Sequence, residues 1–206
     1  MLARAFAEDL AARADAVFER GRAQALDTLP CARGCHACCI GPFPITSLDA
    51  ARLTEAVAQL PLDLAQHIRT RADEQITAYE TAFPQLRRQP HLDEWDDAEI
   101  DRLVSQFSDR PCPALLDDGA CAVYVDRPIT CRLMGLPVQE GSLVQGPCSS
   151  QPFVPITGLG RSDDESQDFA AREAGALAAH RALTGERREE WLLPYGFLPK
   201  TRASRR

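Results

Sequence analysis

The sequence lacks the hydrophobic runs that mark membrane and secreted proteins. None of its apolar stretches approaches the roughly 18 residues that a membrane-spanning helix needs. The first ten residues include Glu8 and Asp9, and no apolar segment of signal-peptide length follows them. We therefore expect no membrane partner and a cytoplasmic location, in which thiols stay reduced.

Several motifs of catalysis and ligand binding are also missing. The sequence has no Gly-x-Ser-x-Gly nucleophile elbow and no glycine-rich phosphate loop. Its 23 basic residues are outnumbered by 30 acidic ones, and the net charge of -7 argues against nonspecific nucleic-acid binding, which depends on clustered Lys and Arg. We expect no nucleic-acid partner, and we interpret the basic stretch 200–206 as a solvated terminus.

Cysteine, in contrast, is dense and confined to two blocks. The first block holds Cys31, Cys35, Cys38 and Cys39, and the second holds Cys112, Cys121, Cys131 and Cys148. Thiolates this close repel one another unless a cation or a disulfide neutralises them. Disulfide scaffolds are mostly secreted domains of under about 80 residues, whereas this chain has 206. Metal or cluster binding is therefore favoured over structural disulfides and over a thiol redox role.

The sulfur-rich ligand set suits zinc and iron–sulfur clusters and disfavours magnesium, calcium and manganese. A structural zinc ion takes four ligands, so eight cysteines can fill two zinc sites, fill one with spares, or hold a four-iron cluster. The side chains of the adjacent Cys38 and Cys39 diverge, so we expect them to bind two different metals or one of them to stay unligated. The spacing from Cys31 to Cys38 also matches the signature of radical S-adenosylmethionine enzymes, but no βα-barrel pattern follows it.

Apolar residues at helical spacing, together with capping and breaking residues, predict a mostly α-helical fold. The predicted helices cover residues 2–29, 48–60, 62–82, 93–107 and 165–184, with Thr46 or Ser47 as the cap of the second. Residues 93–97 place four acidic side chains in what we expect to be the first turn of the fourth helix, where the helix dipole favours anions.

Around the second cysteine block the sequence predicts short and irregular elements. Asp118-Gly119 is a hairpin signal, with strands expected at 115–116 and 122–125. Pro128 is expected to begin a short helix that carries Cys131. Residues 135–160 are expected to be irregular, and the apolar tail 191–197 to pack on the core. We expect a single domain, 1–206, in which the hairpin and loops bring the two cysteine blocks together around a metal centre.

The two blocks together resemble the CxxCxxCC family of bacterial proteins, also called YkgJ-like, which is named for zinc or iron chelation. The matching residues are Cys31, Cys35, Cys38, Cys39, Cys112, Pro113, Leu115, Gly119, Cys121, Tyr124, Arg127, Pro128, Cys131, Arg132 and, later, Cys148. The resemblance implies a core at about 31–44 and 111–148, with a helical insertion at about 46–107 and an extension at about 160–206. The chain departs from the family pattern in its three-residue first gap and in Leu133, where an aromatic residue is expected.

Three further residues near the cysteines are candidates for binding the centre. Arg127 and Arg132 are expected to offset the negative charge of the thiolates, the alternative being a salt bridge elsewhere. Tyr124 is expected either to donate a hydrogen bond to a cysteine sulfur or to fill the core. His36 lies between two cysteines, and an exposed neighbour is favoured over a ligand.

The remaining histidines are expected to be structural. His67 and His180 lie on predicted helices, where surface or packing roles are expected. His91 precedes the acidic helix and is a candidate hydrogen-bond donor.

Two functions remain open at this point. One is a metal-binding protein, with a structural, storage or metal-handling site for zinc or iron. The other is an iron–sulfur or metal-dependent enzyme that acts on a small molecule or a protein side chain. The metal or cluster is the expected partner, and the sequence identifies no protein partner.

The first prediction concerns metal removal. Residues 31–44 and 111–150 contain little regular structure and few apolar side chains, so ligand bonds are expected to substitute for packing there. A chelator should loosen these segments and lower the melting temperature, while the helices predicted at 2–29 and 62–82 persist. An unchanged melting temperature and helical circular dichroism signal after chelation would contradict this expectation.

Overall fold

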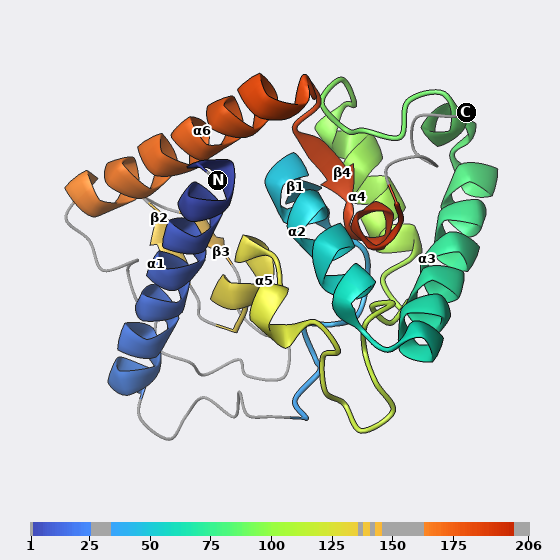
Figure 1. The fold of residues 1–206 in the computed structure, drawn as a ribbon, viewed down its shortest axis with the longest axis horizontal. Helices are drawn as coiled ribbons and strands as arrows, with labels where there is room; N and C mark the ends of the chain where they lie inside the picture. The colour runs from blue at the N-terminus through green and yellow to red at the C-terminus, as the bar shows by residue number, and fades with distance from the viewer. Residues whose placement is uncertain (1, 26–33, 136–137, 141–142, 146–162, 200–206) are drawn as a thin grey trace. The chain divides into compact units, whose positions relative to one another are not determined.

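A computed structural model describes residues 2–25, 34–135, 138–140, 143–145 and 163–199. The fold is mostly helical, as the sequence predicts, with two small antiparallel sheets (Figure 1). The chain divides into two compact units, and the expected single domain, 1–206, stays a prediction. Unit 1 comprises Met1–Cys38 and Pro128–Gly185, and unit 2 comprises Cys39–Arg127 and Glu186–Arg206.

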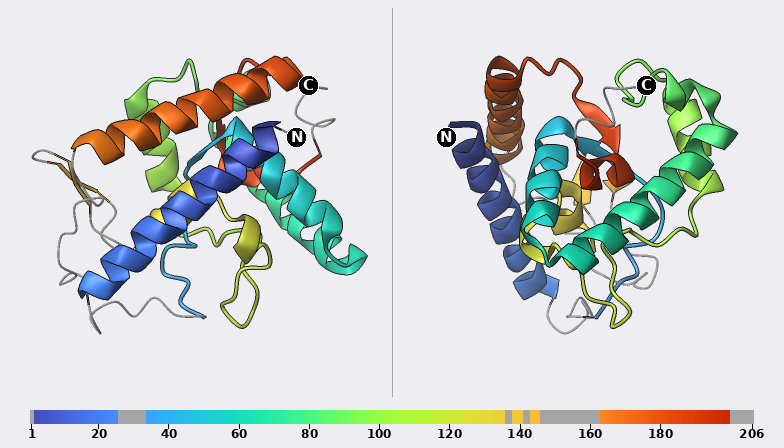
Figure 2. Two further views of the ribbon diagram at one scale, coloured as in Figure 1. Left: turned by 60° about the vertical axis from the view of Figure 1, so that its left-hand side comes forward. Right: turned by 45° about the vertical axis from the view of Figure 1, so that its right-hand side comes forward.

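Unit 1 is built on two long helices, α1 (Leu2–Ala25) and α6 (Asp163–Thr184), which pack against each other. Figure 2 shows α6 crossing α1. The short helix α5 (Ile129–Leu133) also packs on α1. The predicted continuation of the first helix beyond residue 25 lies outside the described residues.

The contact between α1 and α6 combines small apolar side chains with exposed ion pairs. Leu10 and Ala14 of α1 and Ala176 of α6 are buried. Beside them, Arg13 pairs with Asp9 at 2.9 Å, and Arg172 pairs with Asp168 at 2.7 Å. Cross-pairs from Arg13 to Asp168 at 3.4 Å and from Arg172 to Asp9 at 3.5 Å join the two helices. Each exposed pair adds little stability, so the apolar contact holds the helices together.

Unit 2 holds the larger core. Its helices are α2 (Ser47–Gln59), α3 (Leu62–Ala82) and α4 (Asp97–Gln106), with 3-10 turns η2 (Pro84–Arg87), η3 (Tyr124–Asp126) and η4 (Leu193–Phe197). Strand β1 (Pro44–Thr46) pairs antiparallel with β4 (Glu190–Leu192), which places Pro44 opposite Leu192. Leu192 and Phe197 are almost fully buried, which confirms the prediction that the apolar tail packs on the core.

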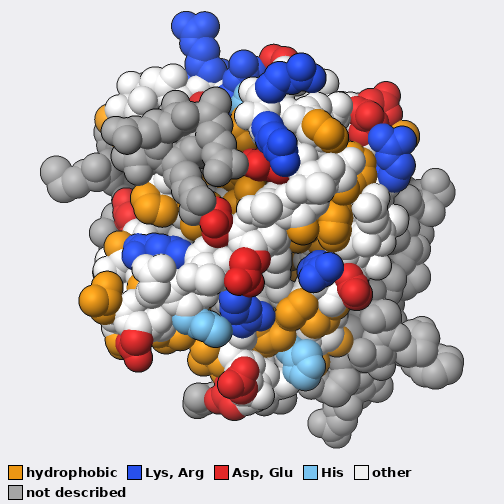
Figure 3. Space-filling view, turned by 90° about the vertical axis from the view of Figure 1, so that its right-hand side faces the viewer, with side chains coloured by type: hydrophobic (Ala, Val, Ile, Leu, Met, Phe, Trp, Pro, Cys, Tyr) orange, Lys and Arg blue, Asp and Glu red, His pale blue; other side chains and the backbone are white. Residues whose placement is uncertain are grey.

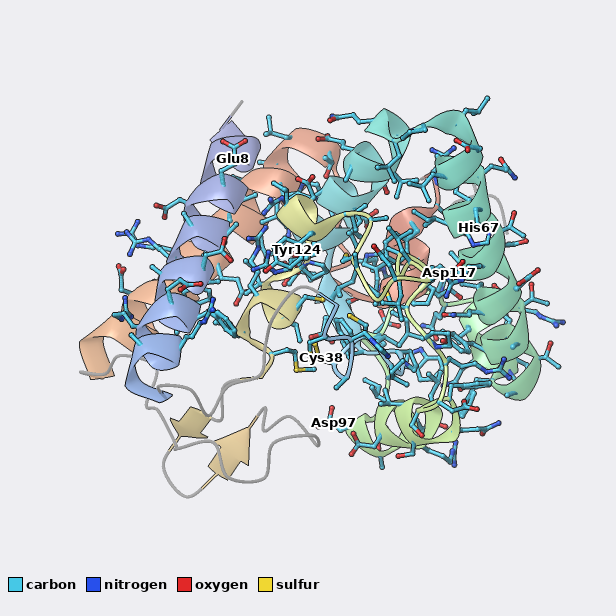
Figure 4. The ribbon with its side chains drawn as sticks, turned by 90° about the horizontal axis from the view of Figure 1, so that it is seen from below. Glu8, Cys38, His67, Asp97, Asp117 and Tyr124 are labelled. Atoms are coloured by element: carbon cyan, nitrogen blue, oxygen red, sulfur yellow. The ribbon has the colours of Figure 1, made fainter. Side chains whose placement is uncertain are left out.

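Helix α3 shows why this helix could be predicted from the spacing of its apolar residues. Its buried side chains Ile68, Ala72, Ile76 and Tyr79 form a stripe on one face of the helix. His67 lies on the exposed side (Figure 4). On the face of the molecule that carries α3, Figure 3 shows acidic and basic side chains interspersed with hydrophobic ones. The helix therefore has one face in the core and another in solvent.

The helix ends are set by individual side chains. Thr46 caps α2, with its hydroxyl oxygen accepting from the Asp49 N–H at 3.1 Å, as predicted. The predicted start of the fourth helix at residue 93 is wrong. Asp96 is the cap, accepting from the Ala98 N–H at 2.9 Å. The preceding residues pair with the last strand instead, through the Leu92 N–H to the Glu190 carbonyl at 2.9 Å.

The predicted hairpin at 115–125 is only partly formed. The turn closes with the Leu116 N–H donating to the Ala120 carbonyl at 2.8 Å, but a single bridge, Leu115 to Cys121, follows from it. Residues 124–126 then form η3 instead of a strand. A hairpin does form further on, from β2 (Val138–Glu140) and β3 (Leu143–Gln145), in the stretch expected to be irregular. The short helix after Pro128 is confirmed as α5.

Among the described helices, none combines the length and the apolar content needed to span a membrane.

His91 is a buried titratable group in unit 2. The residue is 8% exposed, and its ring meets Trp191 edge-on at a centroid distance of 6.0 Å. The nearest charged oxygen to its Nδ1, Oδ2 of Asp93, lies 3.8 Å away, and among the described residues this nitrogen has no hydrogen-bond partner. Burial lowers the pKa of His91, and the positive charge of Arg188 lowers it further. The nearby carboxylates raise it by less; these are Asp93, Glu94 and Glu186. The neutral imidazole is therefore the form that the folded protein prefers.

This environment predicts that unit 2 loses stability in mild acid. Because the pKa of His91 is lower in the folded than in the unfolded chain, the unfolded chain binds more protons as the pH falls through the ordinary histidine range. The free energy of unfolding should decrease from pH 7.5 to 5.5, by at most about 1.4 kcal/mol per pH unit. Urea unfolding of the wild type and of His91→Phe measures this, and the variant should show the flatter dependence. Burial raises the pKa of Glu190, so this residue makes folding more favourable as the pH falls. It does so equally in the wild type and in His91→Phe and does not affect their comparison. Equal slopes for the two proteins would contradict the assignment to His91.

Candidate metal centre

The structure describes six of the eight cysteines. Cys31 and Cys148 lie outside the described residues. Cys35, Cys38 and Cys131 belong to unit 1, and Cys39, Cys112 and Cys121 belong to unit 2. None of these six forms a disulfide.

In unit 2 a short antiparallel pairing joins the end of the first cysteine block to the start of the second. The Cys112 N–H donates to the Cys39 carbonyl at 2.8 Å, and the Gly41 N–H donates to the Arg110 carbonyl at 2.7 Å. Gly41 has a φ of +90°, and a Cβ there would lie 3.4 Å from the Ser108 Cα, so glycine suits both the conformation and the space. This backbone pairing brings one cysteine from each block together, and convergence of the whole blocks on one metal site stays a prediction.

Cys112 begins a tight turn that also brings in Cys121. The Leu115 N–H donates to the Cys112 carbonyl at 3.0 Å, and the Ala122 N–H donates to the Ala114 carbonyl at 2.9 Å. Leu115 forms a bridge with Cys121, which places the third cysteine of this unit beside the turn.

The Cys112 thiol lies in an environment with opposing electrostatic effects. Burial raises the pKa of Cys112 to about 12, and the nearby Cys121 adds to the increase. The backbone N–H groups of Ala114 and Leu115 and the guanidinium of Arg71 act in the other direction. The thiol is therefore protonated at neutral pH. Hydrogen-bond donors that already face the sulfur are what a metal-bound thiolate requires.

Helix α3 contributes two residues that the sequence analysis missed. Arg71 Nη1 donates to the Leu115 carbonyl at 2.7 Å, and Nη2 donates to the Cys112 carbonyl at 3.2 Å. Gln75 Nε2 donates to the Pro111 carbonyl at 2.7 Å. Their spacing of four residues places them on one helix face, but no local pattern indicates which loop that face meets.

In unit 1, Cys35 and Cys38 lie in a non-helical segment and Cys131 lies on a short helix. Residues 37 and 38 form a turn, and Gly34 before this segment has a φ of +93°. Cys35 is exposed, whereas Cys38 and Cys131 are partly buried. His36 is exposed and its Nδ1 lies 3.1 Å from the Gly34 carbonyl, consistent with the favoured role of an exposed neighbour.

The two candidate arginines have different environments. Arg132 is 4% exposed, and its Nη1 lies 2.6 Å from Asp15 Oδ2, so the helix that carries Cys131 is tied to α1 by a salt bridge. Arg127 stacks over the Tyr124 ring at 4.0 Å and donates to the Tyr124 carbonyl at 2.9 Å. Tyr124 is 62% exposed, so it does not fill the core (Figure 4). The roles of these three residues toward a metal stay predictions.

Over the described part of the chain, no three His, Cys, Asp or Glu side chains are grouped as a metal ion would require. Cys112 and Cys121 supply two soft sulfur donors, and Cys112 carries preformed N–H partners, which suits zinc or iron. A four-coordinate ion needs further donors.

The Asp15–Arg132 salt bridge generates a stability prediction. Replacing Asp15 with Asn should destabilise unit 1 by about 1–2 kcal/mol, because the guanidinium of Arg132 is buried and loses a charged partner. The control is Asp9→Asn, which makes the same change on the same helix in the exposed ion pairs with Arg13 and Arg172 and should cost less than about 1 kcal/mol. Urea unfolding and amide hydrogen exchange of α5 give the comparison. Equal effects of the two substitutions would show that burial of Arg132 does not matter.

The comparison with known proteins agrees with this donor chemistry. A family model described as "Putative zinc- or iron-chelating domain" matches residues 30–149, which is more than half of the chain and includes all eight cysteines. No curated protein matches the chain, and no solved structure matches it. The chain therefore belongs to the CxxCxxCC family.

Proposed function

We propose that this protein binds zinc or iron through its cysteine thiolates and serves as a metal-binding protein, in a structural, storage or metal-handling role. The proposed ligands are drawn from Cys31, Cys35, Cys38, Cys39, Cys112, Cys121, Cys131 and Cys148. The observation that carries the proposal is the hydrogen bond between Cys39 and Cys112, which joins the two sequence blocks beside a partly buried thiol.

The electrostatics of Cys112 support a cation as the natural partner of this group. A buried thiolate without a counter-ion is unfavourable, and burial therefore raises the pKa of Cys112 to about 12. A divalent metal replaces the proton and supplies the missing charge. The N–H groups of Ala114 and Leu115 then stabilise the sulfur in its ligand form.

The same argument sets the pH dependence of binding. Each ligating thiol must lose its proton, so acid competes with the metal. Since the pKa of Cys112 lies above neutrality, its proton is still bound over the range from pH 6 to 8. The apparent affinity for zinc should rise by about tenfold per pH unit for each proton released.

The central test is the metal content of anaerobically purified protein. We expect more than one zinc or iron atom per chain by elemental analysis. Absorption near about 400 nm would identify an iron–sulfur cluster, whereas a colourless protein with stoichiometric zinc would identify zinc sites. Cys112→Ser and Cys121→Ser should each weaken binding by more than about tenfold, since each removes a thiolate donor. Ser105→Ala, at an exposed position, is the control and should bind normally. Less than one metal atom per chain, together with paired disulfides, would refute the proposal.

A further inference from the structure

Arg71 holds the two ends of the turn that begins at Cys112. Its guanidinium donates from Nη1 to the Leu115 carbonyl at 2.7 Å and from Nη2 to the Cys112 carbonyl at 3.2 Å. The Leu115 N–H closes the same turn on the Cys112 carbonyl at 3.0 Å. The planar guanidinium therefore connects two backbone carbonyls that lie three residues apart, using a different nitrogen for each.

A second side chain of α3 extends this support by one residue. Gln75 Nε2 donates to the Pro111 carbonyl at 2.7 Å. The hydroxyl of Tyr79, a side chain with no exposed surface, donates to Gln75 Oε1 at 3.2 Å and fixes the orientation of the amide. Three carbonyls of the loop, those of Pro111, Cys112 and Leu115, are thus held by one helix face.

This arrangement bears directly on the sulfur. The N–H groups of Ala114 and Leu115, which act as hydrogen-bond partners of the Cys112 thiol, belong to the turn that Arg71 holds. Without Arg71, the turn would keep only its own backbone hydrogen bonds, from the Leu115 N–H to the Cys112 carbonyl and from the Ala122 N–H to the Ala114 carbonyl.

We propose that Arg71 is a positioning residue of the metal site, which holds the Cys112 turn in its present geometry before any metal binds. The inference rests on the proposed function and adds a helix residue to it that contributes no ligand atom. Pre-ordering lowers the entropic cost of binding, because the backbone around the ligand is already restricted. The turn at 111–115 should accordingly lose less order on metal removal than the sequence alone suggests.

The test compares Arg71→Met, which removes both the fork and the charge, with Arg71→Lys, which keeps the charge alone. The controls are Arg88→Met and Arg88→Lys at an exposed position of the same unit. Two quantities are measured for each variant. The first is amide hydrogen exchange of Cys112, Ala114 and Leu115 in chelator-treated protein. The second is the zinc dissociation constant, from competition with a chromophoric chelator.

We expect Arg71→Met to raise exchange of these three amides and to weaken zinc binding, each by about tenfold or more. Arg71→Lys should also weaken zinc binding and raise exchange nearly as much, since lysine lacks the planar pair of nitrogens that reaches both carbonyls. The Arg88 variants should match the wild type. Exchange of the buried face of α3, from Ile68 to Tyr79, reports that each variant is folded.

Three results would overturn the inference. Normal behaviour of Arg71→Lys would show that charge alone suffices, and weak zinc binding without faster exchange in the turn would show that Arg71 does not order it. Faster exchange without any change in zinc affinity would leave Arg71 with a structural role only. Failure of the proposed function is distinguishable, because the wild type itself would then bind neither zinc nor iron.

Discussion

The cost of burying a thiol close to other thiols is the constraint on which the cysteine-bearing part of unit 2 depends. Cys112 is held beside Cys121 by the Leu115 bridge and next to Cys39 by backbone pairing. Two backbone N–H groups and a guanidinium stabilise the thiolate in part. Burial has the larger effect, so the pKa of Cys112 stays far above neutrality. A bound cation would supply the missing positive charge, and this is the physical basis of the proposed metal binding.

In each unit an arginine ties a cysteine-bearing segment to a long helix, but it does so by a different interaction. In unit 2 the helix supplies the arginine, and Arg71 of α3 binds backbone carbonyls of the Cys112 turn. In unit 1 the cysteine segment supplies it, and Arg132 next to Cys131 binds Asp15 of α1. Segments with few apolar side chains thereby gain fixed positions from charge-assisted hydrogen bonds.

Much of the helical structure was predictable because its causes are local. The apolar stripe from Ile68 to Tyr79 and the Thr46 cap act within one or two turns of chain, and the sequence displays both. Local sequence signals gave wrong element boundaries where a segment distant in sequence pairs with the same residues. Residues 91–95 carry acidic side chains suited to a helix start, yet pairing of His91 and Leu92 with the last strand delays α4 to Asp97. The Asp118-Gly119 turn forms, but residues 124–126 turn back into η3 instead of extending the strand.

The sequence by itself determined the donor chemistry, the family and the positions of the long helices. Eight thiols in two blocks define a soft ligand set whatever the fold, because softness is a property of sulfur. Tertiary structure alone decided that Cys39 pairs with Cys112, that Arg71 and Gln75 meet the carbonyls of the Cys112 turn, and that Tyr124 faces solvent. These outcomes depend on which surfaces are buried together when residues some 40 to 70 positions apart come into contact. The spacing of residues along α3 does not indicate which loop its polar face contacts.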